Sequence, residues 1–441
     1  MAVPPLLTDL YQLTMMKAYL DNGKTEEAAF ELFVRELPEN RNYLIFCGLE
    51  EVFQVIENLR FSESDIDYLY SLKLFPDRFL DFLKEFRFTG KVYSIRDGTP
   101  FFAQEPVLRV EAPIYQAQLL ETALMNQVHI SSLAATKAAR IYTVARGRAI
   151  ADFSLRRTHG SDAGLKVAKY SYVAGFNGTS NVLAGKLYGI PVIGTVAHSF
   201  IMSFESEGEA FRAYLRSYPD KAILLVDTYD TVEGVKRAIE AAKEMGVELK
   251  GVRLDSGNVV ELSKLVREIL NEAGFERAKI IVSGGLDEYR IDEILKAGAE
   301  VDAFGVGTKF GVSSDSPYID FVYKLVEVGG KPVMKTSPGK KMYPGKKQVF
   351  RKKEGDVVGV WGEELPGRPL LELVMEGTER RTEVPPLKEI RDYCISQLEN
   401  LPEEVRDIRR KAKYPVAFSR KLEELYRKIL RKIEEEEGEL S

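Results

Sequence analysis

Short apolar runs alternate with amphipathic segments between residues 222 and 306. The apolar runs predict strands, and the segments between them, each ending near a glycine, predict helices. Strands that are apolar on both faces are typical of a parallel sheet covered by helices. With two further runs upstream, the predicted strands are 149–154, 192–196, 222–226, 250–254, 279–282 and 301–306, and the predicted helices are 231–245, 259–270 and 287–297.

Five or more parallel strands in succession, with no dinucleotide-binding fingerprint in the first strand-to-helix turn, favour a (β/α) barrel over a doubly wound sheet. The flanking regions have other patterns. Residues 1–115 mix helical and β-like segments, which predicts an α+β region, and residues 116–146 predict a long helix or a helix pair. After residue 318 the chain returns to β-like runs, a basic loop and a helical end. We therefore divide the chain into 1–115, 116–318 and 319–441.

The composition excludes several classes of protein. The 441 residues include 62 Lys and Arg against 67 Asp and Glu, a net charge of −5, so no overall cationic field would hold a nucleic acid or an anionic membrane. No apolar stretch approaches the roughly 18 residues that a membrane span needs. Cys47 and Cys394 lie far apart and outside any CxxC motif, which argues against a disulfide framework and structural zinc. The N-terminus shows no secretion leader, so a cytoplasmic location is expected.

Polar or ionisable residues followed by small ones come directly after nearly every predicted strand. The chemistry of a parallel barrel lies at the carboxyl ends of its strands, so these residues predict the active site. In chain order they are Asp152, Phe153, residues 156–160, His198, Ser199, Asp227, Asp255, residues 283–285 and residues 305–308.

Two of these segments are rich in glycine and predict a phosphate site. Ser283-Gly284-Gly285 opens a predicted helix, and residues 305–308 (GVGT) leave the last strand. Glycines let backbone N–H groups approach an anion, and a helix N-terminus adds partial positive charge. Tight turns also use glycine for steric reasons alone, but loops after the final strands of a barrel are a recurrent phosphate site.

Arg253 and Asp255 place a cation and an anion on one face of a strand end, because side chains two residues apart point the same way. The carboxylate suits hydrogen bonds from sugar hydroxyls or a divalent ion beside a phosphate. The pair therefore fits a diphosphate and a ribose better than an apolar ligand. The alternative for Asp255, and equally for Asp227, is a helix N-cap.

The three histidines differ in their placement. His198 follows a predicted strand within GTVAHS, where a neutral imidazole can act as general base, metal ligand or nucleophile toward phosphorus. A structural histidine is the alternative there. His129 falls in the long helical region, which favours core packing, and His159 is compatible with either role.

Eight segments, in order along almost the whole chain, carry a family resemblance. They are LLTDLYQLTM at 6–15, DFSLRRTHG at 152–160, FNGTSN at 176–181, GTVAHS at 194–199, VRLDSGN at 252–258, IIVSGGLDE at 280–288, FGVGT at 304–308 and KTSPGKKMYPGKKQVFR at 335–351. With these segments the chain resembles the nicotinate phosphoribosyltransferases. The ordered set is far more specific than any one of its members.

The resemblance implies a fold, an assembly and a reaction. The fold is an α/β, incomplete parallel (β/α) barrel with a second α+β domain built from the N-terminal and post-barrel segments. The assembly is a homodimer with active sites near the subunit interface. The reaction converts nicotinate, 5-phosphoribosyl diphosphate, ATP and water to nicotinate mononucleotide, diphosphate, ADP and phosphate, a step of NAD salvage that is also classed as a ligase reaction. Mg²⁺ is the expected cofactor, because diphosphate leaves as an anion.

The resemblance also implies roles for single residues. Asp255 would hold the ribose hydroxyls and Arg253 the phosphate-rich substrate, while ATP would phosphorylate His198 and so couple its hydrolysis to substrate binding. No metal ligand is assigned. The residues implied for the 5-phosphate are Ser283, Gly284, Gly285, Gly305, Gly307 and Thr308.

Nicotinate is a flat aromatic carboxylate, which calls for stacking and for a cation or a set of donors. The resemblance implies that Phe153 and Tyr11 of the partner subunit sandwich the ring. Arg156 with Thr179 or Ser180 would face the carboxylate. Ser199 completes the substrate-binding set.

The segment 331–353 holds nine Lys or Arg and no acid, although the chain is acidic overall. One interpretation is a solvated β-hairpin whose lysines prevent edge pairing. The resemblance instead implies a loop that approaches the diphosphate or the phosphates of ATP.

Other functions remain as alternatives. A nicotinamide phosphoribosyltransferase should present a carboxylate to the amide nitrogen, where residues 176–181 offer hydroxyls and amides. A quinolinate phosphoribosyltransferase needs cations for two carboxylates and works without ATP. A catalytically silent nucleotide-binding relative typically loses the histidine, the aspartate or the glycines, all of which are present. An unrelated sugar-phosphate isomerase leaves Tyr11, Phe153 and Arg156 unexplained.

Overall fold

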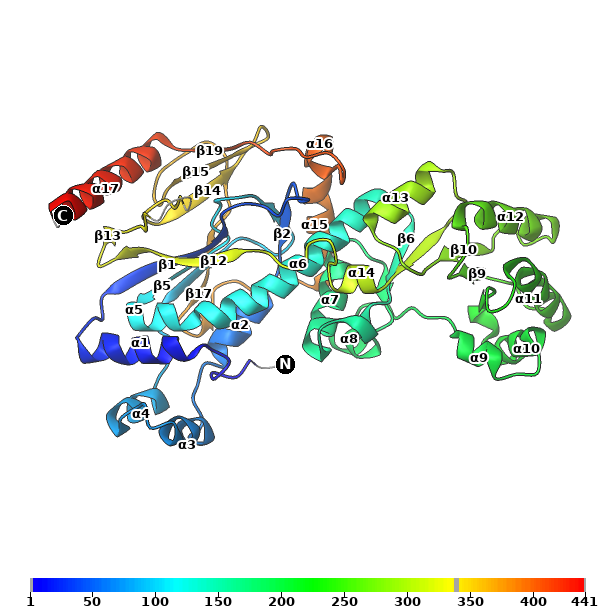
Figure 1. Ribbon diagram of the computed structural model, residues 1–441, viewed down its shortest axis with the longest axis horizontal. Helices are drawn as coiled ribbons and strands as arrows, with labels where there is room; N and C mark the ends of the chain where they lie inside the picture. Colours follow the sequence, from blue (N-terminus) through cyan, green and yellow to red (C-terminus); the bar gives the residue numbers. More distant parts are fainter. Residues whose placement is uncertain (1–2, 337–340, 440–441) are drawn as a thin grey trace. The chain divides into compact units, whose positions relative to one another are not determined.

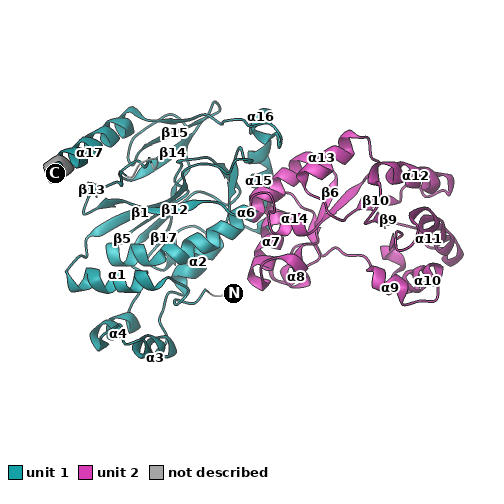
Figure 2. Ribbon diagram, in the orientation of Figure 1, with its two compact units in different colours: residues 1–133, 318–441 teal, residues 134–317 magenta. Residues whose placement is uncertain are grey.

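The computed structural model describes residues 3–336 and 341–439. The chain divides into two compact units, one of residues 1–133 with 318–441 and one of residues 134–317 (Figure 2). The first division falls inside one continuous helix, α6 (Glu121–Ala145), whereas the sequence placed its boundary just before the helical region, at 115/116. The second division lies next to the boundary placed at 318/319. Because the helix is continuous across this division, no change in composition marks the boundary in the sequence.

In the first unit, strands from the N-terminal part of the chain and strands that follow residue 318 pair in one antiparallel sheet of seven strands (Figure 1). Its order is β13-β12-β1-β5-β3-β17-β18, so β1 (Glu27–Val34) lies between β12 (Phe321–Val328) and β5 (Leu108–Pro113). β1 reads EAAFELFV and is buried at every residue but the first, as a central strand should be. The N-terminal and post-barrel segments therefore build one α+β unit, as expected.

The other elements of this unit are shorter. A second sheet has the order β16-β14-β15-β19, and β2 pairs with β4. The strands are β2 (Leu44–Phe46), β3 (Lys91–Ser94), β4 (Thr99–Phe101), β13 (Lys331–Pro332), β14 (Lys347–Arg351), β15 (Asp356–Val360), β16 (Arg368–Pro369), β17 (Glu372–Glu376), β18 (Glu379–Arg380) and β19 (Val416–Phe418). The helices are α1 (Leu10–Asp21), α2 (Leu49–Glu57), α3 (Glu63–Ser71), α4 (Asp77–Lys84), α5 (Ile114–Ala117), α15 (Leu387–Glu399), α16 (Glu403–Arg406) and α17 (Arg420–Glu439).

The second unit is built on a parallel sheet of six strands in the order β7-β6-β11-β10-β9-β8. The last strand of the chain in this unit pairs with the first, as in a barrel, but within the described residues the edge strands β7 and β8 have no strand between them. The sheet is therefore an incomplete barrel, which confirms the expected fold class. The strands are β6 (Ala149–Asp152), β7 (Gly178–Thr179), β8 (Ile223–Leu225), β9 (Gly251–Leu254), β10 (Lys279–Val282) and β11 (Ala303–Val306).

Helices separate these strands along the chain (Figure 1). The helices predicted at 231–245 and 259–270 begin at the predicted residue, and the one predicted at 287–297 begins one residue later, at Glu288. The side chains of Asp230, Asn258 and Asp287 cap three of them by accepting backbone N–H groups. Gly246 ends the first of these in a left-handed conformation, with φ of 64°. The helices are α7 (Ser161–Val173), α8 (Val182–Tyr188), α9 (His198–Met202), α10 (Glu207–Ser217), α11 (Thr231–Met245), α12 (Val259–Glu272), α13 (Glu288–Lys296) and α14 (Thr308–Gly311).

One predicted strand is wrong. Residues 192–196 form no strand, and only Val192 makes an isolated parallel bridge, to Thr179. Val192 is 53% exposed, because it lies at the open edge of the sheet where no further strand covers it. Residues 194–196 line a pocket instead.

Neither Cys47 nor Cys394 forms a disulfide, and both are buried. Burial raises the pKa of each thiol, and the negative charge of Asp97 adds to the effect in both. Across residues 3–336 and 341–439, no helix combines the length and apolar character required to cross a bilayer.

Candidate active site

A pocket of about 410 Å³ lies at the carboxyl ends of the parallel strands of the second unit. It includes residues that follow β6 and β9, and the segment 194–198 that replaces the predicted strand. Six residues predicted from the sequence line it together: Phe153, Arg156, Ser180, His198, Arg253 and Asp255. Its other lining residues are Leu155, Gly194, Thr195, Val196 and Ala197.

Arg253 is the centre of the polar contacts in this pocket. Its Nε donates to Oγ of Ser283 at 3.0 Å, and its Nη2 donates to Oδ1 of Asp255 at 3.3 Å. Its Nη1 donates to Oγ1 of Thr195 at 2.7 Å and to the carbonyl oxygen of Val196 at 3.3 Å. The guanidinium therefore holds the segment before His198 against the ends of β9 and β10, and the predicted Arg253–Asp255 juxtaposition is confirmed.

Asp255 is a partly exposed carboxylate held by several donors. Oγ of Ser283 donates to its Oδ1, and the backbone N–H of Asp255 donates to Oδ2 of Asp227 at 2.9 Å. Burial raises the pKa of Asp255, but the Ser283 hydrogen bond, the charge and hydrogen bond of Arg253 and a smaller contribution from His198 bring that pKa below its ordinary value. The site therefore keeps this group ionised.

The helix-cap alternative is wrong for both aspartates. Asn258 caps the helix after Asp255, and Asp230 caps the helix after Asp227. Asp227 is 9% exposed and accepts hydrogen bonds from Asp255 N and from Ser256 Oγ, the latter at 2.6 Å. It therefore links the end of β8 to the end of β9.

His198 begins helix α9, with its ring partly exposed in the pocket. Its Nδ1 lies 3.1 Å from Oγ1 of Thr228, and its Nε2 lies 3.9 Å from Oδ2 of Asp255. One ring nitrogen is therefore engaged by a hydroxyl, while the other faces a carboxylate beyond hydrogen-bond distance. The sequence analysis missed Thr228, although it follows Asp227 at a strand end.

Phe153 occupies the place that Gly305 leaves open. A Cβ atom on Gly305 would lie 2.4 Å from the Phe153 ring, closer than any side chain tolerates. The Arg253 guanidinium lies 5.9 Å from the centroid of the same ring. Glycine at 305 is thus required for an aromatic wall of the pocket, a steric role in addition to the one expected from the sequence.

Thr179 and Ser180 were alternatives for the nicotinate carboxylate, and the structure separates them. Thr179 is fully buried and its hydroxyl donates to Oδ2 of Asp152 at 2.7 Å, whereas Ser180 lines the pocket. Asp152 also accepts hydrogen bonds from N and Oγ of Ser154, at 2.9 and 2.6 Å. Burial raises the pKa of Asp152 despite these three donors.

The two glycine-rich loops follow the adjacent strands β10 and β11. Gly284 has φ of 88°, and a Cβ atom there would lie 2.2 Å from the carbonyl oxygen of Asp255, so this loop packs directly against the end of β9. Gly285 is also left-handed, with φ of 64°. In the second loop, after Gly307, Oγ1 of Thr308 accepts a hydrogen bond from Nη1 of Arg157 at 3.3 Å.

Other candidates lie outside the pocket. Ser199 is exposed beside His198 without lining it, and Tyr11 is on α1 of the first unit with 48% of its surface exposed. His129 accepts a hydrogen bond from the N–H of Ile319 at 3.0 Å, and burial lowers its pKa, in agreement with a structural role. His159 is exposed.

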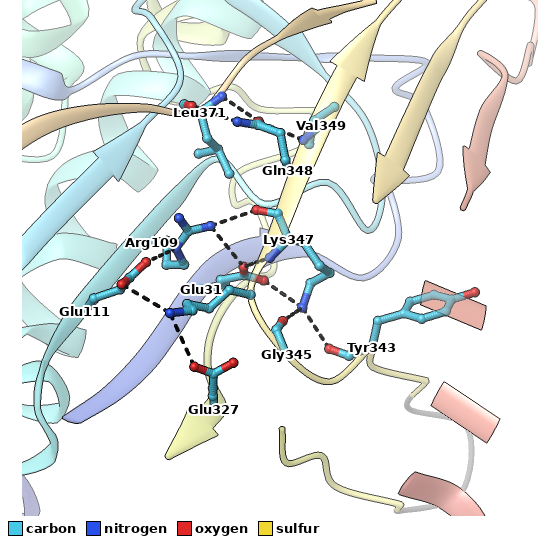
Figure 3. A network of polar contacts seen from close by, with 11 residues as sticks. Glu31, Arg109, Glu111, Glu327, Tyr343, Gly345, Lys347, Gln348, Val349 and Leu371 are labelled. Atoms are coloured by element: carbon cyan, nitrogen blue, oxygen red, sulfur yellow. Dashed lines mark hydrogen bonds and ion pairs between the residues drawn. The ribbon is translucent and has the colours of Figure 1, made fainter. Parts of the chain in front are cut away.

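The basic segment 331–353 is partly buried in the first unit. Nζ of Lys347 pairs with Oε2 of Glu31 at 2.8 Å and donates to the carbonyl oxygens of Tyr343 and Gly345 (Figure 3). Lys346 pairs with Glu111 and Glu327. Neither lysine belongs to a solvated hairpin. Residues 337–340, at the centre of the segment, lie outside the described residues.

Comparison with known proteins covers almost the whole chain. Residues 6–129 match the nicotinate phosphoribosyltransferase (NAPRTase) N-terminal domain, residues 148–356 match the nicotinate phosphoribosyltransferase (NAPRTase) family, and residues 362–426 match the nicotinate phosphoribosyltransferase C-terminal domain. Nicotinate phosphoribosyltransferase pncB2 of Mycobacterium tuberculosis is 48% identical over 426 residues, which cover 95% of this chain and 92% of that protein. The chain belongs to the nicotinate phosphoribosyltransferase family.

Further proteins are similar to this chain over most of its length. The nicotinate phosphoribosyltransferase of Bacillus subtilis is 38% identical, covering 98% of this chain and 97% of its own length. The crystal structure of human nicotinic acid phosphoribosyltransferase superposes with a TM-score of 0.85 at 28% identity, over 96% of this chain and 99% of that one. A nicotinate-nucleotide pyrophosphorylase from Pyrococcus furiosus gives 0.74 at 29% identity, over 89% and 94% of the two chains.

Proposed function

We propose that this protein is a nicotinate phosphoribosyltransferase, which transfers the phosphoribosyl group of 5-phosphoribosyl diphosphate to nicotinate in NAD salvage. The observation that carries the proposal is the pocket itself. It brings the Phe153 ring, the Arg156 guanidinium, a histidine and the Arg253–Asp255 pair together at the carboxyl ends of the parallel strands. A pyridine carboxylate and a phosphorylated sugar require this combination of groups.

Nicotinate binds against the aromatic wall that Phe153 forms, with its carboxylate toward Arg156. The ring offers a stacking face, while Arg156 and the hydroxyl of Ser180 face the carboxylate. Asp152, the carboxylate directly before Phe153, is buried and accepts hydrogen bonds from Ser154 and Thr179. It therefore presents no acceptor to an amide, which favours nicotinate over nicotinamide.

The phosphoribosyl group binds on the other side of the pocket. Asp255, ionised at neutral pH, accepts hydrogen bonds from the ribose hydroxyls, and backbone N–H groups of the loops at 283–285 and 305–308 hold the 5-phosphate. As diphosphate leaves, positive charge grows at the anomeric carbon beside this carboxylate. Arg253 then balances the charge of Asp255 and of the departing anion.

Mg²⁺ fits this set of residues. Oδ1 of Asp227 is buried and accepts no hydrogen bond from the described residues, and Asp255 is partly exposed nearby in the same network. No three His, Cys, Asp or Glu side chains within residues 3–336 and 341–439 gather to hold a metal alone, so substrate oxygens and water would complete its coordination. The ion would supply charge neutralisation to the diphosphate.

His198 is the residue through which ATP acts. With Nδ1–H donating to Thr228 Oγ1, the lone pair of Nε2 is free to attack the γ-phosphorus of ATP. The N–P bond forms as the bond to the ADP oxygen breaks, and water later releases phosphate from the histidine. Proximity to Asp255 places the phosphorylated ring beside the ribose site, which couples ATP hydrolysis to substrate binding.

The active enzyme is a cytoplasmic homodimer. Leu7, Leu10, Tyr11 and Met15 are exposed near the start of the chain, and Val182, Leu183, Leu187 and Val192 are exposed in the segment that follows Ser180. Exposed apolar side chains gathered in this way are typical of subunit interfaces. Tyr11 of the partner subunit completes the ring sandwich with Phe153. Two buried free thiols agree with a reducing compartment.

Product formation by the purified chain tests the proposal. The chain is mixed with 5-phosphoribosyl diphosphate and Mg²⁺, and nicotinate, nicotinamide and quinolinate are offered separately, each with and without ATP. Mononucleotide from nicotinate, increased by ATP, is the expected result. Turnover of another base instead would reassign the substrate, and no turnover with any base, while the diphosphate substrate still binds, would indicate a silent nucleotide-binding relative.

A further inference from the structure

The two glycine-rich loops are joined by one ion pair, and we propose that this pair positions them for the 5-phosphate. Nζ of Lys309 lies 2.9 Å from Oδ2 of Asp287. Lys309 directly follows Thr308 of one loop, and Asp287 comes two residues after Gly285 of the other. The inference rests on the phosphate site proposed above and makes Asp287 and Lys309 positioning residues for that site.

Backbone hydrogen bonds hold each loop to a different neighbour. The register of β10 with β11 runs only to Val282 and Phe304, the residues before the loops. In the first loop, the N–H of Ser283 donates to the carbonyl oxygen of Leu254 in β9 at 2.9 Å. In the second loop, the carbonyl oxygen of Val306 accepts the N–H of Phe153, which follows β6, at 2.8 Å. The Asp287–Lys309 pair therefore connects the two loops beyond the last paired residues of β10 and β11.

The pair also removes an electrostatic conflict. Asp287 caps helix α13 by accepting the N–H of Arg290 on Oδ1 at 2.8 Å, so its carboxylate stands at the same helix start as the proposed anion site. Alone, this carboxylate would repel a phosphate. Lys309 neutralises it through the other oxygen, which lets an acidic cap and an anion-binding loop share one helix start.

Each of the two loops is also held by contacts that do not involve the Asp287–Lys309 pair. Glu288, the residue after Asp287, is fully buried and pairs with Lys137 at 2.5 Å and with Arg140 at 2.9 Å, both from α6. On the other loop, Thr308 is held by Arg157. Changes at Asp287 and Lys309, whose side chains are 14% and 46% exposed, therefore leave the helices folded and alter only how the loops face each other.

The test compares Asp287→Asn, Lys309→Met and the double variant with the wild-type chain. Asparagine keeps the cap but not the charge. KM for 5-phosphoribosyl diphosphate should rise about tenfold in K309M, which leaves an unpaired carboxylate beside the anion, and about threefold in D287N. The double variant should return to the D287N value. The turnover number and KM for nicotinate should stay within about twofold.

Arg290→Gln is the matched control, because it removes a surface ion pair with Glu293 from the same helix. It should change none of these constants. A D287N variant that binds 5-phosphoribosyl diphosphate as well as wild type, with the double variant as weak as K309M, would show that Lys309 contacts the phosphate directly and would overturn the positioning role. Unchanged KM in all three variants would overturn it too. If wild type fails to turn over nicotinate, the proposed function fails, and titration calorimetry with 5-phosphoribosyl diphosphate on the same chains still tests the pair.

Discussion

The Nδ1 atom of His198 lies 3.1 Å from the hydroxyl oxygen of Thr228. Thr228 comes after β8, one edge of the parallel sheet, and His198 comes after Val192, which bridges to the other edge strand, β7. The contact therefore joins the two edges of the incomplete barrel at the level of the pocket. The open side of the sheet is where the histidine is held.

Replacement of Thr228 by Val should weaken the effect of ATP more than the transfer reaction itself. Valine keeps the volume but removes the oxygen that orients the imidazole. We expect ATP stimulation to fall about tenfold, with ATP-independent product formation within about twofold of wild type. His198→Asn should remove the stimulation completely. Rates with and without ATP check both variants, and full stimulation in T228V would separate the hydroxyl from the function of His198.

Gly305→Ala should displace the aromatic wall of the pocket. The added methyl group would stand 2.4 Å from the Phe153 ring, so the ring must move, at a cost of about 1–3 kcal/mol in unfolding free energy. KM for nicotinate should rise more than KM for 5-phosphoribosyl diphosphate. Gly208→Ala is the control, because a methyl group on that helical glycine meets only the Arg212 side chain at 3.6 Å. Equal effects of G305A on both KM values would argue against stacking on Phe153.

Lys347→Met should destabilise the first unit by about 3 kcal/mol, because it leaves the fully buried Glu31 without its closest cation (Figure 3). Arg109, whose Nη1 lies 3.9 Å from Glu31, compensates only in part. Lys84→Met removes an exposed i,i+3 pair with Asp81 and should leave the urea midpoint close to that of wild type, because exposed ion pairs add little to stability. Urea denaturation of both variants gives the comparison, and a small loss for K347M would show that the network is not needed for stability.

Glu105→Gln should change how stability depends on pH. Burial, followed by the negative charge of Asp356, raises the pKa of Glu105 well above its ordinary value. A raised folded-state pKa means that stability is fully present below the unfolded pKa and is lost as pH rises through the folded one. E105Q should therefore be close to wild type in acid and gain relative to it as pH rises. Thermal midpoints across pH check this, with the exposed Glu399→Gln as control; parallel curves would contradict it.

The sequence was sufficient for elements whose signals are local. Helix α11 begins after Asp230 and ends at Gly246, because a capping side chain and a left-handed glycine are properties of single positions. The continuous apolar runs likewise predicted β8 to β11. The strand predicted at 192–196 is wrong, because an apolar run that lines a pocket and one that enters a sheet have the same pattern.

The sequence by itself determined which chemical groups stand at the strand ends, since the carboxyl ends of parallel strands share one edge. It also indicated the family, through motifs spread over the whole chain. Only the tertiary structure decided which of those groups meet. It placed Ser180 rather than Thr179 at the pocket, linked His198 to Thr228 and buried Lys347. These outcomes depend on contacts between residues distant in sequence. No local sequence pattern specifies which distant residue will form a hydrogen bond with a given hydroxyl or an ion pair with a given charged group.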